Sequence, residues 1–119
     1  MILVVEDDED IRELLVSALE GRGFTVEQAS DGEAAIRVLE GSERPCLMVL
    51  DLVMPGVDGF GVLAHMKARS IQNVPVCVMS ALAERAPAGV IATLRKPFEL
   101  QELFSLAQRY CTTDHPATG

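Results

Sequence analysis

Short apolar runs alternate along this chain with segments in which apolar residues recur at helical spacing. The runs are rich in valine, isoleucine and leucine, and they cover residues 2–5, 24–28, 46–50, 74–79 and 90–94. Runs of this length, bounded by turn-forming residues, predict strands that are buried on both faces, as in parallel sheets. Because strands and helices alternate, the pattern predicts an α/β fold in which right-handed crossovers connect parallel strands.

The helix-like segments carry recognisable start and stop signals. Gly21 follows the first segment and Gly41 the second, and Asp31 can cap the second helix at its start. A third helix is expected from about Asp58, and a last helix from Leu100 onward. Helices between successive strands cover both faces of a sheet, so we expect a doubly wound five-stranded parallel sheet.

Length and composition indicate one domain. The chain has 119 residues, of which 49% are hydrophobic, and this is enough for a substantial core. We expect the folded domain over residues 1–111 and a flexible polar tail over residues 112–119. No apolar stretch approaches the roughly 20 residues of a membrane-spanning helix. The first strand begins at Ile2, which leaves no room for a signal peptide, and we therefore expect a cytoplasmic protein.

The chain has three cysteines, Cys46, Cys77 and Cys111. The first two lie in apolar, strand-like runs, where a small thiol packs well. Disulfides are rare in the cytoplasm. We expect all three to be reduced residues without a redox or metal-binding role.

The net charge of the chain is −8. A DNA-binding domain is expected to carry a basic stripe, so the charge argues against direct nucleic-acid binding. Neither the charge nor the hydropathy indicates a membrane partner. We expect the partners to be other proteins and a cation.

Polar residues stand where several of the predicted strands end. Glu6 and Asp7 follow the first strand, Asp51 the third and Ser80 the fourth, and Lys96 comes just past the fifth. In a flavodoxin-like sheet of order 2-1-3-4-5, the first and third strands are neighbours at the topological switch point, where ligands bind. We therefore expect these side chains to converge on one site. Taken alone, Asp51 would also be explained as a turn residue.

The carboxylates of Glu6, Asp7 and Asp51 would repel one another unless a cation joined them. Oxygen ligands suit a hard, partly hydrated ion, and Mg²⁺ is the ion that we expect. An acidic run at the start of a helix is also favoured by the helix dipole without any metal. We adopt that explanation for residues 8–10 and keep Glu6 and Asp7 as candidate ligands.

Ser80 and Lys96 add the groups that a phosphoryl site requires. The ammonium of Lys96 and the hydroxyl of Ser80 can both stabilise charge on a transferring phosphoryl group. Singly, a turn serine and a surface lysine are common. Together with the carboxylate of Asp51 as nucleophile, they indicate an aspartyl-phosphate site.

Over residues 1–111 the chain resembles the receiver domains of bacterial two-component response regulators. The matching motifs are Val4-Val5-Glu6-Asp7, Asp51 with Met54-Pro55-Gly56 and Asp58-Gly59, Val76 to Ala81, and Lys96-Pro97-Phe98. The resemblance implies that Asp51 takes a phosphoryl group from the phosphohistidine of a histidine kinase, and that Ser80 and Lys96 contact this group. It also implies a cis peptide bond between Lys96 and Pro97, which X-Pro bonds allow at low cost.

The same resemblance implies how magnesium is held. In such domains the residue matching Asp7 binds the ion directly, and the one matching Glu6 binds it through water. The residue matching Val53 provides its backbone carbonyl, so its side-chain type is free. Asp51 completes the expected set of metal ligands.

The chain departs from the family pattern at several positions. The family usually has an aromatic residue three positions before the site lysine, and here that position is Thr93. The segment 81–88, interrupted by Pro87, is too short for a full fourth helix, which we expect to be short or missing. The two rim positions that usually carry polar residues are Val53 and Leu82. Switching and hydrolysis are therefore expected to differ from those of relatives.

The sequence favours a phospho-accepting receiver module that takes a phosphoryl group from a histidine kinase or phosphotransfer protein and switches binding to an unknown downstream protein. It would catalyse only its own phosphorylation and dephosphorylation. The alternative, motivated by Thr93 and the shortened segment, is a receiver-like interaction module that works without phosphorylation. A magnesium-dependent phosphohydrolase fits the chemistry, but 119 residues leave no cap or substrate pocket.

Overall fold

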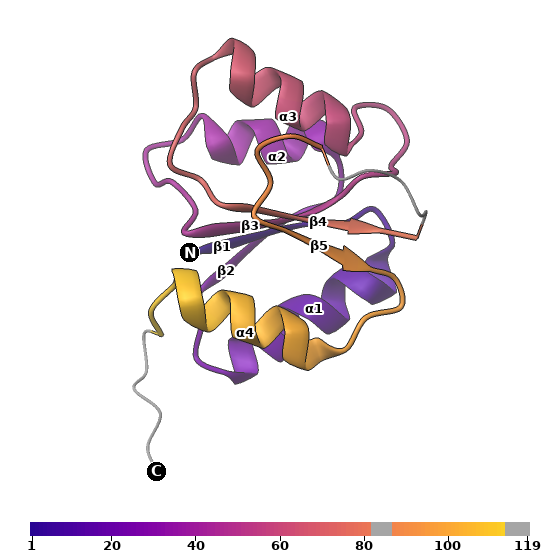
Figure 1. The fold of residues 1–119 in the computed structure, drawn as a ribbon, viewed down its shortest axis with the longest axis vertical. Helices are drawn as coiled ribbons and strands as arrows, with labels where there is room; N and C mark the ends of the chain where they lie inside the picture. The colour runs from indigo at the N-terminus through magenta and orange to yellow at the C-terminus, as the bar shows by residue number, and fades with distance from the viewer. Residues whose placement is uncertain (82–86, 114–119) are drawn as a thin grey trace.

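A five-stranded parallel sheet with helices on both faces forms the centre of the molecule, as the computed structural model of residues 1–81 and 87–113 shows (Figure 1). In chain order the elements are β1 (Ile2–Val5), α1 (Glu9–Gly21), β2 (Val26–Ala29), α2 (Gly32–Leu39), β3 (Leu47–Asp51), α3 (Gly59–Ala68), β4 (Val76–Ser80), β5 (Ala92–Arg95) and α4 (Leu100–Tyr110). The strand order is β2-β1-β3-β4-β5. The predicted doubly wound sheet is confirmed.

The two faces of the sheet are covered by different pairs of helices. In Figure 1, α2 and α3 lie above the sheet, and α1 and α4 lie below it. Successive strand residues point to opposite faces, so Ile2 and Val4 pack in the cluster with α1 and α4. Leu3 and Val5 pack in the cluster with α2 and α3. All of β1, β3 and β4 is buried, which explains why these strands are continuous apolar runs.

Three helices start at an aspartate that caps them. Asp8, Asp31 and Asp58 each accept a hydrogen bond from the backbone N–H three residues later, at 3.0, 2.8 and 3.0 Å. Such caps satisfy amide groups that have no partner within the helix. The exposed acidic residues 8–10 therefore begin α1, as expected, and Asp8 has a structural role there.

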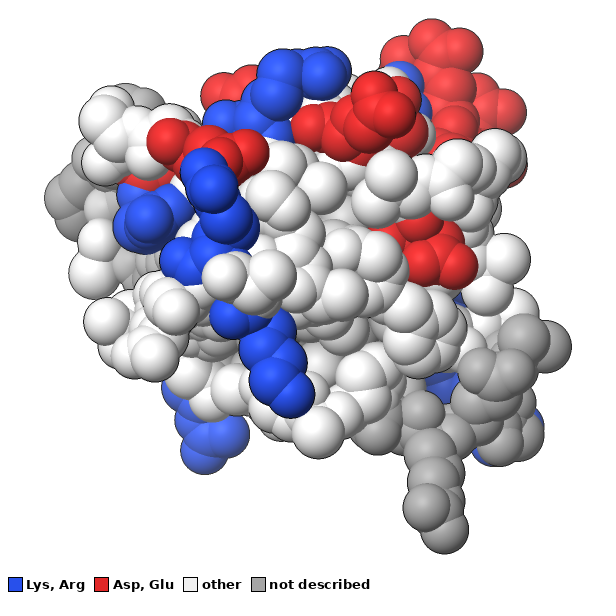
Figure 2. Space-filling view, turned by 90° about the horizontal axis from the view of Figure 1, so that it is seen from above, with Lys and Arg blue, Asp and Glu red and all other residues white. Residues whose placement is uncertain are grey.

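On the side formed by α2 and α3, acidic and basic side chains are interspersed (Figure 2). Nη2 of Arg69, which caps α3, lies 3.1 Å from Oε2 of Glu40, which caps α2. The two side chains are 62% and 39% exposed, so this pair contributes less than about 1 kcal/mol. The packing of α2 against α3 therefore depends mainly on apolar contacts, including Val62 and Met66.

The expected fourth helix between Ser80 and Lys96 falls largely on residues 82–86, which lie outside the described part of the chain. The flanking residues, 81 and 87–91, have turn or irregular backbone. The expected tail, 112–119, likewise lies mostly outside the described residues, with only 112 and 113 described. Among the described helices, none combines the length and apolar character needed to cross a membrane.

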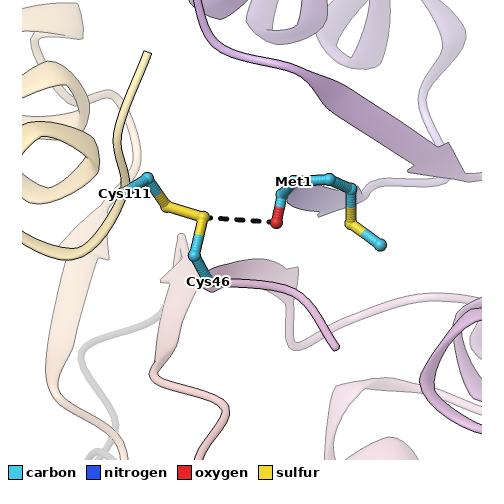
Figure 3. Close-up of a disulfide and its surroundings, with 3 residues drawn as sticks. All are labelled: Met1, Cys46 and Cys111. Carbon is cyan, nitrogen blue, oxygen red and sulfur yellow. Dashed lines mark hydrogen bonds between the residues drawn. A yellow bond between two sulfur atoms is a disulfide. The ribbon is translucent and has the colours of Figure 1, made fainter. Parts of the chain in front are cut away.

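The expectation of three reduced cysteines is wrong. Cys46 and Cys111 form a disulfide, with a Cα–Cα distance of 5.4 Å across 65 residues of sequence (Figure 3). Cys77 is buried and free, as expected. The error arose because Cys111 ends α4, and only the path of this helix back along the sheet brings it beside the residue preceding β3.

Candidate functional site

The carboxyl ends of four strands bring the predicted site residues to one edge of the sheet. Glu6 follows β1, Asp51 ends β3, Ser80 ends β4 and Lys96 follows β5. The register places Val5 beside Leu50, so Glu6 and Asp51 come next on adjacent strands. Among the described residues, the buried polar side chains are Glu6, Asp51 and Ser80, with exposed fractions of 1%, 4% and 4%. All three belong to this site.

Lys96 links the two buried carboxylates. Its ammonium nitrogen donates a hydrogen bond to Oε1 of Glu6 at 2.8 Å and lies 3.4 Å from Oδ2 of Asp51. The strand β5 delivers this lysine to the site, and Lys96 N donates to the carbonyl of Ser80 at 2.8 Å. The peptide bond between Lys96 and Pro97 is cis, as the sequence resemblance implied.

The electrostatics of the site depend on burial and on these close charges. Burial raises the pKa of Glu6, and the neighbouring Asp51 raises it further, while the hydrogen bond from Lys96 acts against both. For Lys96, burial acts to lower the pKa, but the hydrogen bond to Glu6 and the charges of Asp51 and Glu6 outweigh it, so the pKa is raised. Lys96 therefore stays protonated beside the two carboxyl groups.

The loop after β3 is packed tightly against Asp51. Oδ1 of Asp51 accepts a hydrogen bond from Val53 N at 3.2 Å, and Gly59 N donates to Leu52 O at 3.2 Å. A Cβ atom on Gly59 would lie 2.6 Å from Asp51 O. The start of α3 therefore approaches the site so closely that only glycine fits there, which explains the Asp58-Gly59 motif.

Arg12 supports the loop that carries Glu6 and Asp7, and the sequence analysis did not identify it. Its Nη1 donates to the carbonyl oxygen of Glu6 at 3.0 Å, and its Nε donates to Oε1 of Gln28 at 3.0 Å. These bonds tie α1 to the ends of β1 and β2. The sequence did contain one clue to this role. Arg12 lies one turn into a predicted helix, and that helix follows the acidic residues at the end of the first strand.

The carboxylates fit the expected magnesium ion. One oxygen each from Glu6, Asp7 and Asp51 can lie within 4.8 Å of the others. Asp7 is exposed, which leaves room for water on that side, and Oε2 of Glu6 is buried with no hydrogen-bond partner among the described residues. An all-oxygen donor set with an unsatisfied buried oxygen suits a hard divalent cation.

Residues 2–108 match the response regulator receiver domain family. This chain belongs to that family. The fold prediction and the family resemblance are both confirmed.

Curated relatives of this receiver domain include response regulators of mycobacteria. The response regulator MprA of Mycobacterium ulcerans is 39% identical over 110 residues, which cover 87% of this chain and 47% of that protein. MprA of Mycolicibacterium vanbaalenii is 38% identical over 124 residues, which cover 99% of this chain and 53% of that protein. The chain thus spans about half the length of the curated relatives that it matches.

Solved receiver domains have the same fold. The receiver domain of the hybrid histidine kinase CckA is 32% identical, with a TM-score of 0.76, and the match covers 93% of this chain and 98% of that one. The response regulator TrrA of Thermotoga maritima is 26% identical, with a TM-score of 0.78, and the match covers 92% of this chain and 96% of that one. These matches extend over nearly the whole described sheet and its helices.

Two of the departures from the family pattern, Thr93 and Val53, lie in the described part of the chain. Thr93 sits in β5 opposite Val78, and its side chain is exposed. Val53 is 60% exposed beside Asp51. Leu82, the other rim position, lies outside the described residues.

Proposed function

We propose that this receiver domain accepts a phosphoryl group on Asp51, in a reaction that requires Mg²⁺, from the phosphohistidine of a histidine kinase or phosphotransfer protein. The modification then switches binding to a downstream protein. The observation that carries the proposal is the contact of the Lys96 ammonium with the carboxylates of Glu6 and Asp51 at the carboxyl edge of the sheet. We propose residues 1–111 as the extent of the domain and the cytoplasm as its location.

In this proposal each side chain has a separate task. A carboxylate oxygen of Asp51 attacks phosphorus, a new P–O bond forms, and the P–N bond of the donor breaks with its electron pair going to the imidazole. The Lys96 ammonium and the Ser80 hydroxyl offset the negative charge on the phosphoryl oxygens. The Val53 N–H donates to Oδ1 of Asp51 at 3.2 Å and so orients the nucleophile.

The metal is assigned to Glu6, Asp7 and Asp51, together with the backbone carbonyl of Val53. When bound, it supplies positive charge that offsets repulsion between the carboxylates and the incoming phosphoryl group. The relative TrrA was solved in complex with Mg²⁺ and BeF. Since that protein matches 92% of this chain, its complex supports the same ion and a phosphoryl group at this site.

The domain is proposed to act only on its own phosphoryl group and not to turn over an outside substrate. The side chain of Val53 is exposed beside Asp51, and the carboxylate nucleophile is consumed when it is modified. A module that signals without phosphorylation would keep the fold but leave Asp51 unmodified. The two proposals therefore differ in whether Asp51 becomes phosphorylated, which can be measured.

Intact mass after incubation with acetyl phosphate tests the proposal. The protein is expected to gain one phosphoryl group with Mg²⁺ and none with a chelator. Asp51→Asn should abolish the gain, whereas Asp10→Asn, in the exposed first turn of α1, should retain it. A gain that persists in Asp51→Asn or with chelator contradicts the assignment, and no gain in the parent protein favours the interaction module.

A further inference from the structure

The disulfide lies at the edge of the sheet opposite to the acidic site. Cys46 immediately precedes β3, and Asp51 ends the same strand. Cys111 caps the C-terminal end of α4. In Figure 3 the bond joins the end of this helix to the backbone leading into β3, beside Met1. The bond thus connects α4 to the sheet at a distance from the site residues.

The two bonded cysteines are accessible, unlike the third. Both are half-buried, and both line a cavity of about 380 Å³ whose wall also includes Phe24 and Tyr110. Cys77 is completely buried, and burial raises the pKa of its thiol to about 12. A small thiol can therefore approach Cys46 and Cys111 through the cavity, while Cys77 is protected from it.

The surroundings also suit the reduced form of the pair. Sγ of Cys46 lies 3.3 Å from the carbonyl oxygen of Met1, the contact drawn in Figure 3. A bonded sulfur carries no hydrogen, so this contact becomes a hydrogen bond only when Cys46 is a thiol that donates to the oxygen. The same carbonyl accepts from Cys46 N at 2.9 Å, which fixes its position. Both redox forms therefore have a place in the same backbone arrangement.

The last turn of α4 is less buried than the middle of the helix. The middle of the helix is held by the buried side chains of Leu103, Phe104 and Ala107, and the Arg22 guanidinium lies 4.1 Å from the centre of the Phe104 ring. Beyond Ala107, residues 108 and 109 are exposed and Tyr110 is half-buried. Tyr110 and Cys111 pack against the core cluster at its edge, and the bond at Cys111 adds a covalent restraint on this turn.

We infer that Cys46 and Cys111 form a site of reversible thiol–disulfide exchange whose state determines how firmly the C-terminal end of α4 is held to the sheet. The co-reactant is a dithiol. Its thiolate attacks one sulfur, the S–S bond breaks and a mixed disulfide forms, and its second thiol then releases the protein. Two electrons and two protons pass to the protein, and the reductant becomes a disulfide. Cytosolic disulfides are commonly transient or redox-sensing.

Equilibration of the full chain with defined ratios of reduced and oxidised dithiothreitol, followed by acid quench and alkylation, tests the exchange. Cys46 and Cys111 are expected to become alkylated together as the reduced fraction rises, and to be protected again on reoxidation. Cys77→Ala should show the same transition. Two reactive thiols in oxidising buffer, or a bond that stays closed in excess dithiothreitol under native conditions, would overturn the inference.

Hydrogen exchange tests the effect on α4. Reduction should lower the apparent Tm by about 10 °C and raise exchange over residues 107–111 by more than it raises exchange in β1 and β3, which open only on global unfolding. The double variant Cys46→Ala/Cys111→Ala should exchange like the reduced protein in either buffer, which separates the bond from other effects of the reductant. Equal exchange of residues 107–111 in both redox forms would show that the bond does not restrain the helix end.

Discussion

The ammonium of Lys96 lies 2.8 Å from Oε1 of Glu6, although the two residues are 90 positions apart in the chain. The same nitrogen lies 3.4 Å from Oδ2 of Asp51, so one cation offsets the repulsion between two carboxylates from neighbouring strands. This arrangement gives Lys96 two tasks. It stabilises the acidic site before any metal binds, and it faces the carboxylate proposed to receive the phosphoryl group.

Replacing Lys96 should separate metal binding from phosphorylation. In Lys96→Gln the site keeps its carboxylates and loses a positive charge, so Mg²⁺ affinity should equal or exceed that of the parent. The phosphorylation rate should fall by about 10²-fold, the usual effect of removing one charge-stabilising group. Titration calorimetry and a time course of intact mass measure the two quantities.

The matched control is Arg95→Gln, one residue earlier, at the exposed last residue of β5. This change removes the same charge and should alter neither quantity appreciably. A Lys96→Gln protein that loses Mg²⁺ affinity and phosphorylation to the same extent would mean that Lys96 only maintains the structure of the site.

Asp7 should matter far more for metal binding than the acidic residues 8–10 that follow it. Asp7→Asn should weaken Mg²⁺ binding by about tenfold or more, because Asp7 shares the cluster with Glu6 and Asp51. Asp10→Asn removes an exposed charge in the first turn of α1, which is worth only about 0.3–1 kcal/mol to the helix. Equal losses of affinity in calorimetry would place the metal elsewhere in the run.

Gly59 should be intolerant of a side chain. A Cβ there would lie 2.6 Å from Asp51 O and 2.7 Å from the Cα of Leu52, and backbone atoms cannot move aside cheaply. Gly59→Ala should cost about 1–3 kcal/mol of unfolding free energy in urea and slow phosphorylation by displacing Asp51. Gly21→Ala is the control, because a Cβ there meets nothing within 4 Å. Equal stability of the two variants would contradict the close approach of α3.

Most of the fold was predictable because apolar periodicity reports burial directly. The fully buried strands β1, β3 and β4 appear in the sequence as apolar runs, and their alternation with helices predicted a parallel sheet. The strand order came from the flavodoxin-like fold that this pattern fits. Strand β2 was less regular, since Glu27 and Gln28 are exposed at the edge of the sheet. In the structure β2 begins at Val26, two residues later than the start at residue 24 that the apolar pattern predicted.

The convergence of Glu6, Asp51 and Lys96 was predictable for a related reason, because parallel strands end at a common edge. Two features were not predictable. The disulfide depends on where α4 ends relative to the start of β3, and cysteine spacing carries no such information. Arg12 contributes through a carbonyl oxygen, and a contact to backbone leaves no trace in the type of residue at position 6.

Val53 should control how long the phosphoryl group persists. Its N–H donates to Oδ1 of Asp51 at 3.2 Å, which keeps its backbone at the reacting carboxylate, and its side chain is 60% exposed at the rim. An apolar side chain in this place cannot hydrogen-bond the water that must attack phosphorus. Val53→Asn provides a polar group there and should shorten the phosphorylated lifetime by about tenfold, equivalent to about 1.4 kcal/mol of barrier.

The decay of the phosphorylated mass, after removal of the phosphodonor at fixed Mg²⁺, measures this lifetime. Val53→Ile is the control, because it stays apolar and β-branched and should decay like the parent. If Val53→Asn and Val53→Ile decay at the same rate, positioning of water at this rim residue does not limit hydrolysis. If both decay faster than the parent, the shape of the valine matters rather than its lack of a polar group.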